Sequence, residues 1–205
     1  MEITEIKKIG KGQRYYLTMS DDRKFVIEAE VLVKNKLKTG QEFDEEGLKE
    51  ILFENGDYAS FDRALTYLEK GIQTEKGIRE YLKRKGYLDE SIDKTIEKLL
   101  EYGYINDEIY VENYIKTYGN RKGKKLLRFE LLKKGVKQEI IDEKLENMFS
   151  FDDEKNTCII LAEKYLKSKE VDLKTRQKLF AYLMGKGFSS SVINEVIKEL
   201  KCERE

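Results

Sequence analysis

The chain has 205 residues, of which 39% are charged, with 40 basic and 40 acidic residues and no histidine. The lack of histidine excludes histidine-based catalytic triads, histidine proton shuttles and histidine-ligated zinc. The longest apolar run, residues 158–162, is too short to cross a bilayer, and the N-terminus lacks the basic-then-apolar plan of a secretory signal. We therefore expect a soluble, cytoplasmic protein that has no membrane partner.

Catalytic and cofactor motifs are also absent from the sequence. No GxxxxGK[ST] loop occurs, and the glycines of residues 10–13 do not form a dinucleotide fingerprint. Cys158 and Cys202 show no metal-ligand spacing, so we interpret them as a core thiol and a tail thiol. Catalysis by carboxylates alone stays open, but the 40 scattered Asp and Glu residues give no means of selecting a catalytic pair. The sequence predicts no enzyme activity, no cofactor and no metal site.

The N-terminal segment differs from the rest of the chain. Residues 3–33 contain three short segments rich in β-branched and aromatic residues, ITEIKKI, RYYLTM and KFVIEA, with a turn sequence between the second and third. They predict a three-stranded meander. Asp44 is then expected to cap a helix that ends near Asn55, with Gly56 as its terminator. Residues 1–56 are thus predicted to form a small β-rich domain with a helix.

From residue 57 onward the sequence predicts helices and no strand. The nine expected helices are residues 58–70, 75–85, 90–101, 107–118, 122–134, 138–149, 152–167, 173–186 and 190–202. Grouped by three, they form tandem three-helix repeats at residues 57–105, 106–150 and 151–205. The predicted fold class is mostly α, an elongated array of three repeats behind the small β-rich domain.

The repeats are recognised by a pattern around three glycines, Gly86, Gly135 and Gly187, each preceded by lysine. Apolar residues recur six, ten and thirteen residues after each glycine, and also four and eight residues before it. These offsets place one apolar stripe on each of two consecutive helices. The glycine is expected to be a left-handed cap that lets the two helices fold back on each other. We interpret the apolar positions as core.

The repeats have the same apolar pattern, but their charged residues are distributed differently. Residues 116–137 hold nine basic residues and one acidic residue, Glu130, whereas residues 138–154 hold seven acidic residues and one basic residue, Lys144. The chain is neutral as a whole, yet its centre is strongly polarised.

Four of these basic residues could share a face. If the helix already begins near Arg121, then Arg121, Lys124, Lys125 and Arg128 fall within about 100° of one another. Such a face suits an acidic protein groove or a phosphate backbone. The alternative is that these charges are solvated or pair with the acidic helix that follows.

Tyrosines precede the basic run, at positions 104, 110, 114 and 118. The last three are spaced by four residues, which favours packing against the helical core over stacking on nucleic-acid bases.

Several stretches taken in order resemble the RecX family, the bacterial regulators of the RecA recombinase. They are ALTYL at 64–68, TEKGIREYLKRKGYLDE at 74–90, GYINDEIYVENYI at 103–115 and RKGKKLLRFELLKKGV at 121–136. The N-terminal strands also resemble an extension found in many relatives. Thr74 and Gly77 depart from the usual family residues, and the third repeat is the least typical.

The resemblance implies a non-enzymatic regulator that lies along the RecA filament and restrains strand exchange, ATP hydrolysis and coprotease activity in DNA repair and recombination. Single- or double-stranded DNA is a further candidate partner, and we expect a monomer. The residues chosen for partner contact are Arg121, Lys122, Lys124, Lys125 and Arg128, followed by Arg79, Lys83 and Arg84 of the first repeat. Two other functions stay open, a stand-alone DNA-binding helical-repeat protein and a generic helical scaffold.

Overall fold

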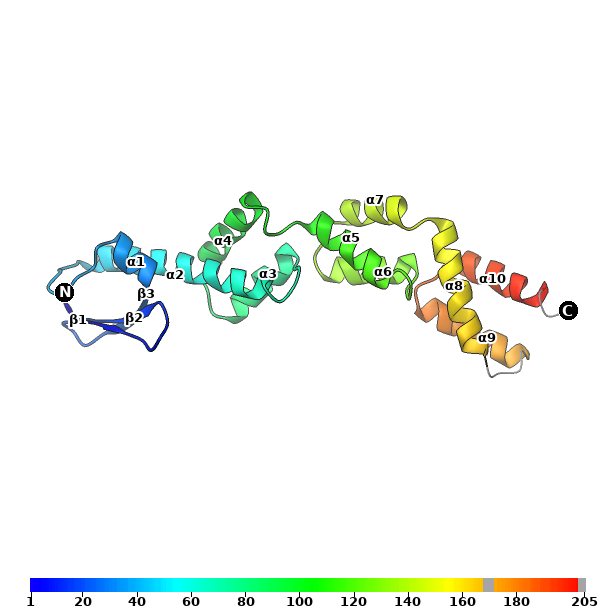
Figure 1. Ribbon diagram of the computed structural model, residues 1–205, viewed down its shortest axis with the longest axis horizontal. Helices are drawn as coiled ribbons and strands as arrows, with labels where there is room; N and C mark the ends of the chain where they lie inside the picture. Colours follow the sequence, from blue (N-terminus) through cyan, green and yellow to red (C-terminus); the bar gives the residue numbers. More distant parts are fainter. Residues whose placement is uncertain (168–171, 203–205) are drawn as a thin grey trace. The chain divides into compact units, whose positions relative to one another are not determined.

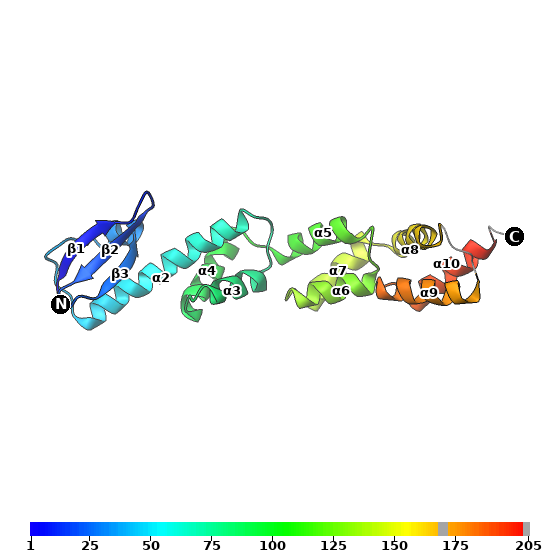
Figure 2. The ribbon, with the colours of Figure 1, turned by 90° about the horizontal axis from the view of Figure 1, so that it is seen from below.

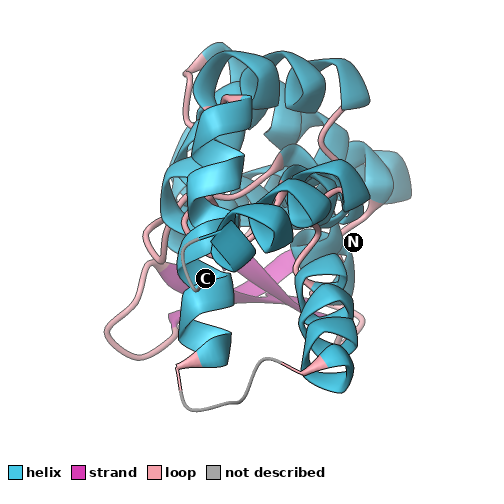
Figure 3. Cartoon of the chain, turned by 90° about the vertical axis from the view of Figure 1, so that its right-hand side faces the viewer, coloured by secondary structure: helices cyan, strands magenta, loops and turns pink. Residues whose placement is uncertain are grey.

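The computed structural model describes residues 1–167 and 172–202, and the side chains of Lys201 and Cys202 lie outside this part. Helices dominate the described residues, and all the strands among them are near the N-terminus (Figure 3). The chain forms two compact units. The first comprises Met1–Ile72 and Ile78–Tyr104, and the second comprises Gln73–Gly77 and Ile105–Glu205.

The first unit begins with the predicted meander. Strands β1 (Ile3–Lys8), β2 (Arg14–Met19) and β3 (Lys24–Glu28) form an antiparallel sheet in that order. The pairing register places Tyr16 opposite Lys7 on one side and opposite Val26 on the other. Since side chains alternate between faces along a strand, these three residues share one face of the sheet.

The opposite face of the sheet carries the core of this domain. Its buried residues are Ile3, Leu17, Met19, Ile27, Val31, Leu37, Leu48 and Ile51. They come from the strands, from α1 (Ala29–Lys34) and from the start of α2 (Glu45–Leu68), which covers this face of the sheet (Figure 2). Asp44 caps α2 as predicted, because its carboxylate accepts a hydrogen bond from the Gly47 amide at 2.8 Å.

Helix α2 does not end at Gly56, so the predicted break between two helices is wrong. The helix continues for 24 residues and joins the β-rich domain to the first repeat. The Asn55 side chain, instead of capping the helix, bonds the edge of β3, where it accepts from Glu28 N–H at 2.7 Å and donates to Val26 O at 3.0 Å. Gly56 lies where α2 approaches another helix, since a Cβ there would be 3.3 Å from Ser91 Oγ. The glycine marks a close helix contact, although it costs about 1 kcal/mol of helix propensity.

The first repeat is completed by α3 (Glu75–Arg84) and α4 (Asp89–Glu101), within a few residues of the prediction. Small polar side chains hold α2 against α4. Ser60 Oγ lies 2.6 Å from Thr95 Oγ1, and both residues are buried. Their hydroxyls satisfy each other, which permits close packing without an unpaired polar group.

The second unit contains the second and third repeats (Figure 1). Its helices are α5 (Asp107–Tyr118), α6 (Lys124–Lys133), α7 (Gln138–Met148), α8 (Phe151–Leu166), α9 (Leu173–Gly185) and α10 (Ser190–Cys202). Each repeat has its own hydrophobic core, built from α5 to α7 in one and from α8 to α10 in the other. The prediction of three tandem three-helix repeats is confirmed.

The glycine pattern has the geometry expected of it. Gly86, Gly135 and Gly187 have φ values of +87°, +84° and +89°. Each sits just after a helix, with the two hydrogen bonds of a Schellman cap. In the second repeat these run from Gly135 N to Leu132 O and from Val136 N to Leu131 O. The apolar positions before the glycines are all buried, and those after them are buried or partly buried.

The lysine before each glycine also has a physical role. Its ammonium lies over a tyrosine ring, at 5.8 Å for Lys85 over Tyr81 and at 5.5 Å for Lys186 over Tyr182. In the second repeat Lys134 lies 5.9 Å from the ring of Tyr110. Such cation–π contacts, together with the negative end of the helix dipole, favour a cation at this position.

The remaining sequence expectations concern the cysteines, metals and membrane spans. Cys158 is fully buried in the core of the third repeat, and burial raises the pKa of its thiol to about 12, which confirms the core assignment. Among residues 1–167 and 172–202, no cluster of potential ligands could hold a metal ion. Within the same residues, no helix has both the length and the apolar character needed to span a bilayer.

Candidate partner-binding surface

The basic segment of the second repeat does not form the single helical face that its spacing predicts. Helix α6 begins at Lys124 with Gly123 as its N-cap, so Arg121 precedes the helix. Arg121 lies in a turn, where its amide donates to Tyr118 O at 3.0 Å. The condition for the predicted face, a helix that starts near Arg121, is therefore not met.

Helix α6 starts late because the third repeat supplies its N-terminal hydrogen bonds. The amides of Gly123 and Lys125 donate to Lys186 O and Gly187 O, at 2.9 and 3.1 Å. The Lys124 amide donates to the buried carboxylate of Glu154 at 2.9 Å. A carboxylate at this place is stabilised by the helix dipole. Because these amides are occupied, any anionic partner would be bound by side chains and not by the helix N-terminus.

The contact between these repeats requires two glycines. A Cβ on Gly123 would lie 2.5 Å from the carbonyl oxygen of Gly187, and a Cβ on Gly187 would overlap the backbone of Leu126. Thr157 adds a side-chain bond across the same junction, from its hydroxyl to Gly119 O at 3.3 Å. The sequence pattern identifies Gly187 only as a helix cap, and it gives no sign of Glu154 or Gly123 as junction residues, because their partners lie some 30 to 64 residues away.

Lys122 points into the second repeat. Its ammonium is 2.5 Å from the Glu130 carboxylate and 4.5 Å from the centre of the Tyr118 ring, and its side chain is 20% exposed. Glu130 also accepts the hydroxyl of Tyr114 at 2.8 Å. Burial acts to raise the pKa of Glu130, but the hydrogen bonds from Lys122 and Tyr114 outweigh it and hold that pKa below its ordinary value. The position of Lys122 is that of an internal counter-ion.

Arg128 is paired with the acidic helix that follows it. Its guanidinium lies 2.6 Å from the Asp142 carboxylate, although about half of each side chain remains exposed. Arg128 therefore follows the alternative stated for the basic residues, in which they pair with the acidic helix that comes next. An exposed pair of this kind contributes little to stability and leaves the arginine able to exchange partners.

Three of the five chosen residues remain available at the surface. Arg121 and Lys125 are exposed and Lys124 is half-buried. Within the described part of the chain, none of these three side chains has an ion-pair partner. Arg121 lies in the turn before α6, and Lys124 and Lys125 are the first two residues of that helix, so the three are close together along the chain.

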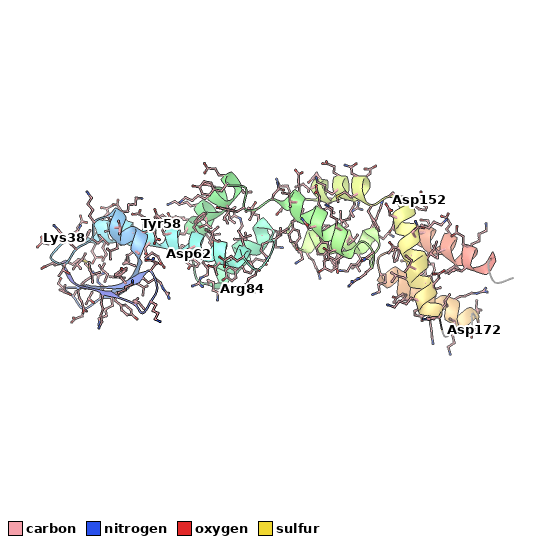
Figure 4. The ribbon with its side chains drawn as sticks, in the orientation of Figure 1. Lys38, Tyr58, Asp62, Arg84, Asp152 and Asp172 are labelled. Carbon is pink, nitrogen blue, oxygen red and sulfur yellow. The ribbon has the colours of Figure 1, made fainter. Side chains whose placement is uncertain are left out.

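The candidates of the first repeat divide in a similar way. Arg79 contacts Asp93 at 2.5 Å and Lys83 contacts Asp89 at 3.2 Å, both between α3 and α4. Arg84, at the C-terminal end of α3, is exposed (Figure 4) and has no ion pair among the residues described. Of these three, Arg84 is the cation most open to a partner.

The tyrosines before the basic run line the core of the second repeat. Tyr110, Tyr114 and Tyr118 pack against its buried residues, with neighbouring ring centres 6.0 and 4.5 Å apart. The core interpretation is confirmed for these three. Tyr104 is different, because 56% of its surface is exposed.

Comparison with known proteins identifies the repeats. Models of the first, second and third three-helix domains of RecX match residues 61–99, 106–145 and 152–197. The regulatory protein RecX of Clostridium beijerinckii is 36% identical over 200 residues, which cover 96% of this chain and 93% of that protein. The chain belongs to the RecX family. The RecX of Clostridium acetobutylicum is also 36% identical, over 99% of both chains.

Solved structures of the RecX family agree with this assignment. A crystal structure of regulatory protein RecX matches with a TM-score of 0.73 and 27% identity, over 96% of this chain and 98% of the other. RecX from Lactobacillus salivarius matches with a TM-score of 0.65 and 28% identity, over 72% and 97%. RecX is a family of regulatory proteins, so a regulatory role follows for this chain.

Proposed function

We propose that this RecX protein binds the RecA nucleoprotein filament and inhibits its recombinase, ATPase and coprotease activities in the cytoplasm, as a monomer and without catalysis of its own. The observation that carries the proposal is family membership along nearly the whole chain. Tandem repeats also suit a partner that is itself a polymer of identical subunits, since successive repeats can engage successive subunits.

The proposed contact surface consists of Arg121, Lys124 and Lys125, with Arg84 of the first repeat as a second contact. All four lack an ion-pair partner in the described part of the chain, so binding an acidic groove or a phosphate would not require them to give up an existing pair. Arginine can bind carboxylate or phosphate through two parallel hydrogen bonds, which makes Arg121 the residue best suited to fix orientation. Lys122 is left out because its ammonium is already bound to Glu130.

The proposal is tested by the DNA-dependent ATPase activity of RecA on single-stranded DNA. We expect the wild-type chain to inhibit it. The variant Arg121→Glu/Lys125→Glu should need at least tenfold more protein for equal inhibition, because two attractive contacts become repulsive. Both side chains point away from the core, so helix content and melting temperature should remain unchanged.

The matched control is Lys164→Glu/Lys198→Glu, which makes the same charge change at exposed positions on α8 and α10. It should inhibit as well as wild type. Equal inhibition by the Arg121/Lys125 variant would reject the surface, and no inhibition by the wild-type chain would reject the function itself.

A further inference from the structure

The outer face of the N-terminal sheet has no role in the contacts described so far. Helices α1 and α2 cover only the inner face, and the outer face is open along all three strands. On it Tyr16, in the central strand, is 45% exposed and its neighbour Val26 is 43% exposed. An exposed aromatic ring at the centre of a small sheet calls for an explanation beyond packing.

Basic residues surround this ring. Residues 7–16 read KKIGKGQRYY and hold four basic residues and no acidic residue. Lys7 is directly opposite Tyr16 in the sheet, and Lys24 lies diagonally across from it on β3. Direct and diagonal neighbours on one face lie within about 8 Å of each other, so both ammonium groups can flank whatever covers the ring.

These cations have not been neutralised by the fold. Lys7, Lys8, Lys11, Arg14 and Lys24 are all exposed, and none has a carboxylate within ion-pair distance among the described residues. The acidic groups near them are Glu5, which lies diagonally across from Tyr16 on β1 and lines the same hollow, Glu28, which is opposite Arg14 in the register, and Glu30 and Asp62, which line a second hollow with Arg14. The positive charges outnumber the negative ones at this surface.

The face is also hollowed. A concavity of about 520 Å³ is lined by Lys7, Lys8, Tyr16, Thr18, Lys24 and Glu5, together with Ile9 and Gly10 of the hairpin. Its volume falls in the range of small-molecule sites, roughly 300–1,000 Å³. Gly10, at the tip of the hairpin, has no side chain. Its φ is +56°, and a Cβ there would meet no neighbour within 4 Å. A flexible chain could therefore enter the hollow along the hairpin.

We infer that this outer sheet face, defined by Lys7, Tyr16 and Lys24 with the hairpin cations beside them, binds single-stranded nucleic acid. The ring of Tyr16 stacks on an unpaired base, and the flanking lysines contact the phosphates on either side. Stacking requires a base that is free of its duplex partner, which favours a single strand over a double helix. The contacts read no base edge, so the binding is independent of sequence.

The inference stands apart from the proposed binding to RecA, and its test contains no recombinase. The full chain is titrated into a fluorescent oligothymidine of about 20 nucleotides at several salt concentrations, and binding is followed by anisotropy. Tyr16→Leu should weaken binding roughly 5- to 150-fold with little change in its salt dependence, since a stacked base contributes on the order of 1–3 kcal/mol. Tyr16→Phe, which keeps the ring, should bind nearly as well as wild type.

The lysines are tested separately. Lys7→Gln/Lys24→Gln should reduce the slope of log affinity against log salt by about 1.4, at about 0.7 for each phosphate contact on a single strand. The matched control is Lys38→Gln/Lys49→Gln, at exposed positions elsewhere in the same domain, one of which is labelled in Figure 4. It should leave the slope unchanged.

Three results would overturn the inference. They are unaltered binding by both the Tyr16→Leu and the Lys7/Lys24 variants, absence of salt-dependent binding by the wild-type chain, and equal loss of affinity for a duplex of the same length in Tyr16→Leu. The last would mean that the ring does not stack on an unpaired base. The Arg121/Lys125 variant should retain oligothymidine binding through the sheet, which keeps a failure of this inference distinct from a failure of the RecA proposal.

Discussion

The first and third repeats differ from the second at a position that the sequence pattern aligns, five residues before the glycine. In the first repeat Tyr81 stacks on Tyr67, with ring centres 4.0 Å apart and planes 9° from parallel. In the third repeat Tyr182 stacks on Tyr165 at 4.9 Å and 28°. Both pairs join the first helix of the repeat to its second helix through two flat apolar faces.

The second repeat makes the same connection with polar groups. Glu130 occupies the aligned position, accepts the hydroxyl of Tyr114 and is paired with Lys122. A half-buried carboxylate needs such partners, because burial without them would cost several kcal/mol. The replacement of one tyrosine by Glu130 thus explains why one lysine of the basic run turns inward. The repeats have the same backbone plan and the same pattern of apolar core positions, and they differ at half-buried positions, where either aromatic stacking or an ion pair joins two helices.

The glycines give a second comparison between repeats. Replacing them by alanine is expected to have the largest effect on stability. Gly86 and Gly187 have nearly the same φ, but a Cβ would meet nothing within 4 Å at Gly86, whereas at Gly187 it would overlap Leu126. Gly86→Ala should cost about 1–2 kcal/mol, for the left-handed conformation alone. Gly187→Ala should cost about 3 kcal/mol or more, because overpacking against backbone is added.

Hydrogen exchange measures these costs repeat by repeat, which is necessary because tandem repeats need not unfold in one step. Gly187→Ala should lower protection in α6 as well as in α9, since the Gly187 carbonyl caps the start of α6. Gly123→Ala is the matching change on the other side of the junction and should produce the same pattern. Equal effects of Gly86→Ala and Gly187→Ala would show that the junction adds nothing to the cap.

An intermediate effect is expected from removing the counter-ion of the second repeat. Lys122→Met keeps the side-chain length but leaves Glu130 with only the Tyr114 hydroxyl, and should destabilise α5 to α7 by about 1–2 kcal/mol, given that both charged side chains are partly solvated. The double variant Lys122→Met/Glu130→Tyr copies the aromatic pair of the other repeats. It should recover most of the loss, as measured by urea unfolding with exchange protection of α6.

The matched control is Lys116→Met, which removes an exposed lysine of the same repeat. It should change stability by less than about 0.5 kcal/mol. If the double variant is less stable than Lys122→Met alone, the second repeat cannot accept the stacked pair, and the alignment of Glu130 with Tyr81 and Tyr182 has no structural meaning.

Much of the fold could be predicted from the sequence, because apolar spacing and glycine conformation act locally. The offsets around Gly135 specify which faces of two helices are buried, and left-handed φ specifies where one of them ends. The prediction that Gly56 ends a helix is wrong for a physical reason. A glycine serves equally as a helix stop and as a site of close approach, and only the position of Ser91, 35 residues later, distinguishes the two.

The candidate surface was less predictable, because side-chain pairing depends on tertiary contacts. Charge counting identified the basic segment but could not separate Lys122, which is bound to Glu130, from Lys125, which faces solvent. Nor could it place the start of α6, which is set by carbonyls of the third repeat and by Glu154. Local patterns locate the region of interest, and long-range hydrogen bonds decide which of its side chains are available.

The smallest expected effect concerns pH and sharpens the comparison at Glu130. Its pKa lies below the ordinary value in the folded chain, where burial is outweighed by Lys122 and Tyr114. A carboxylate of this kind stabilises the fold above its unfolded pKa, and that contribution is lost as the pH falls through the lower, folded value. Wild type should therefore exceed Glu130→Gln in stability at pH 7 and pH 5, by less than about 1 kcal/mol because the pair is partly solvated. The difference should shrink below about pH 4, near the unfolded pKa of a glutamate.

Urea unfolding of both proteins at pH 7, 5 and 3.5 measures this difference in stability, and Glu139→Gln, at an exposed position on α7, is the control. A difference that grows on acidification would mean that burial dominates and that the second repeat holds Glu130 in its protonated form.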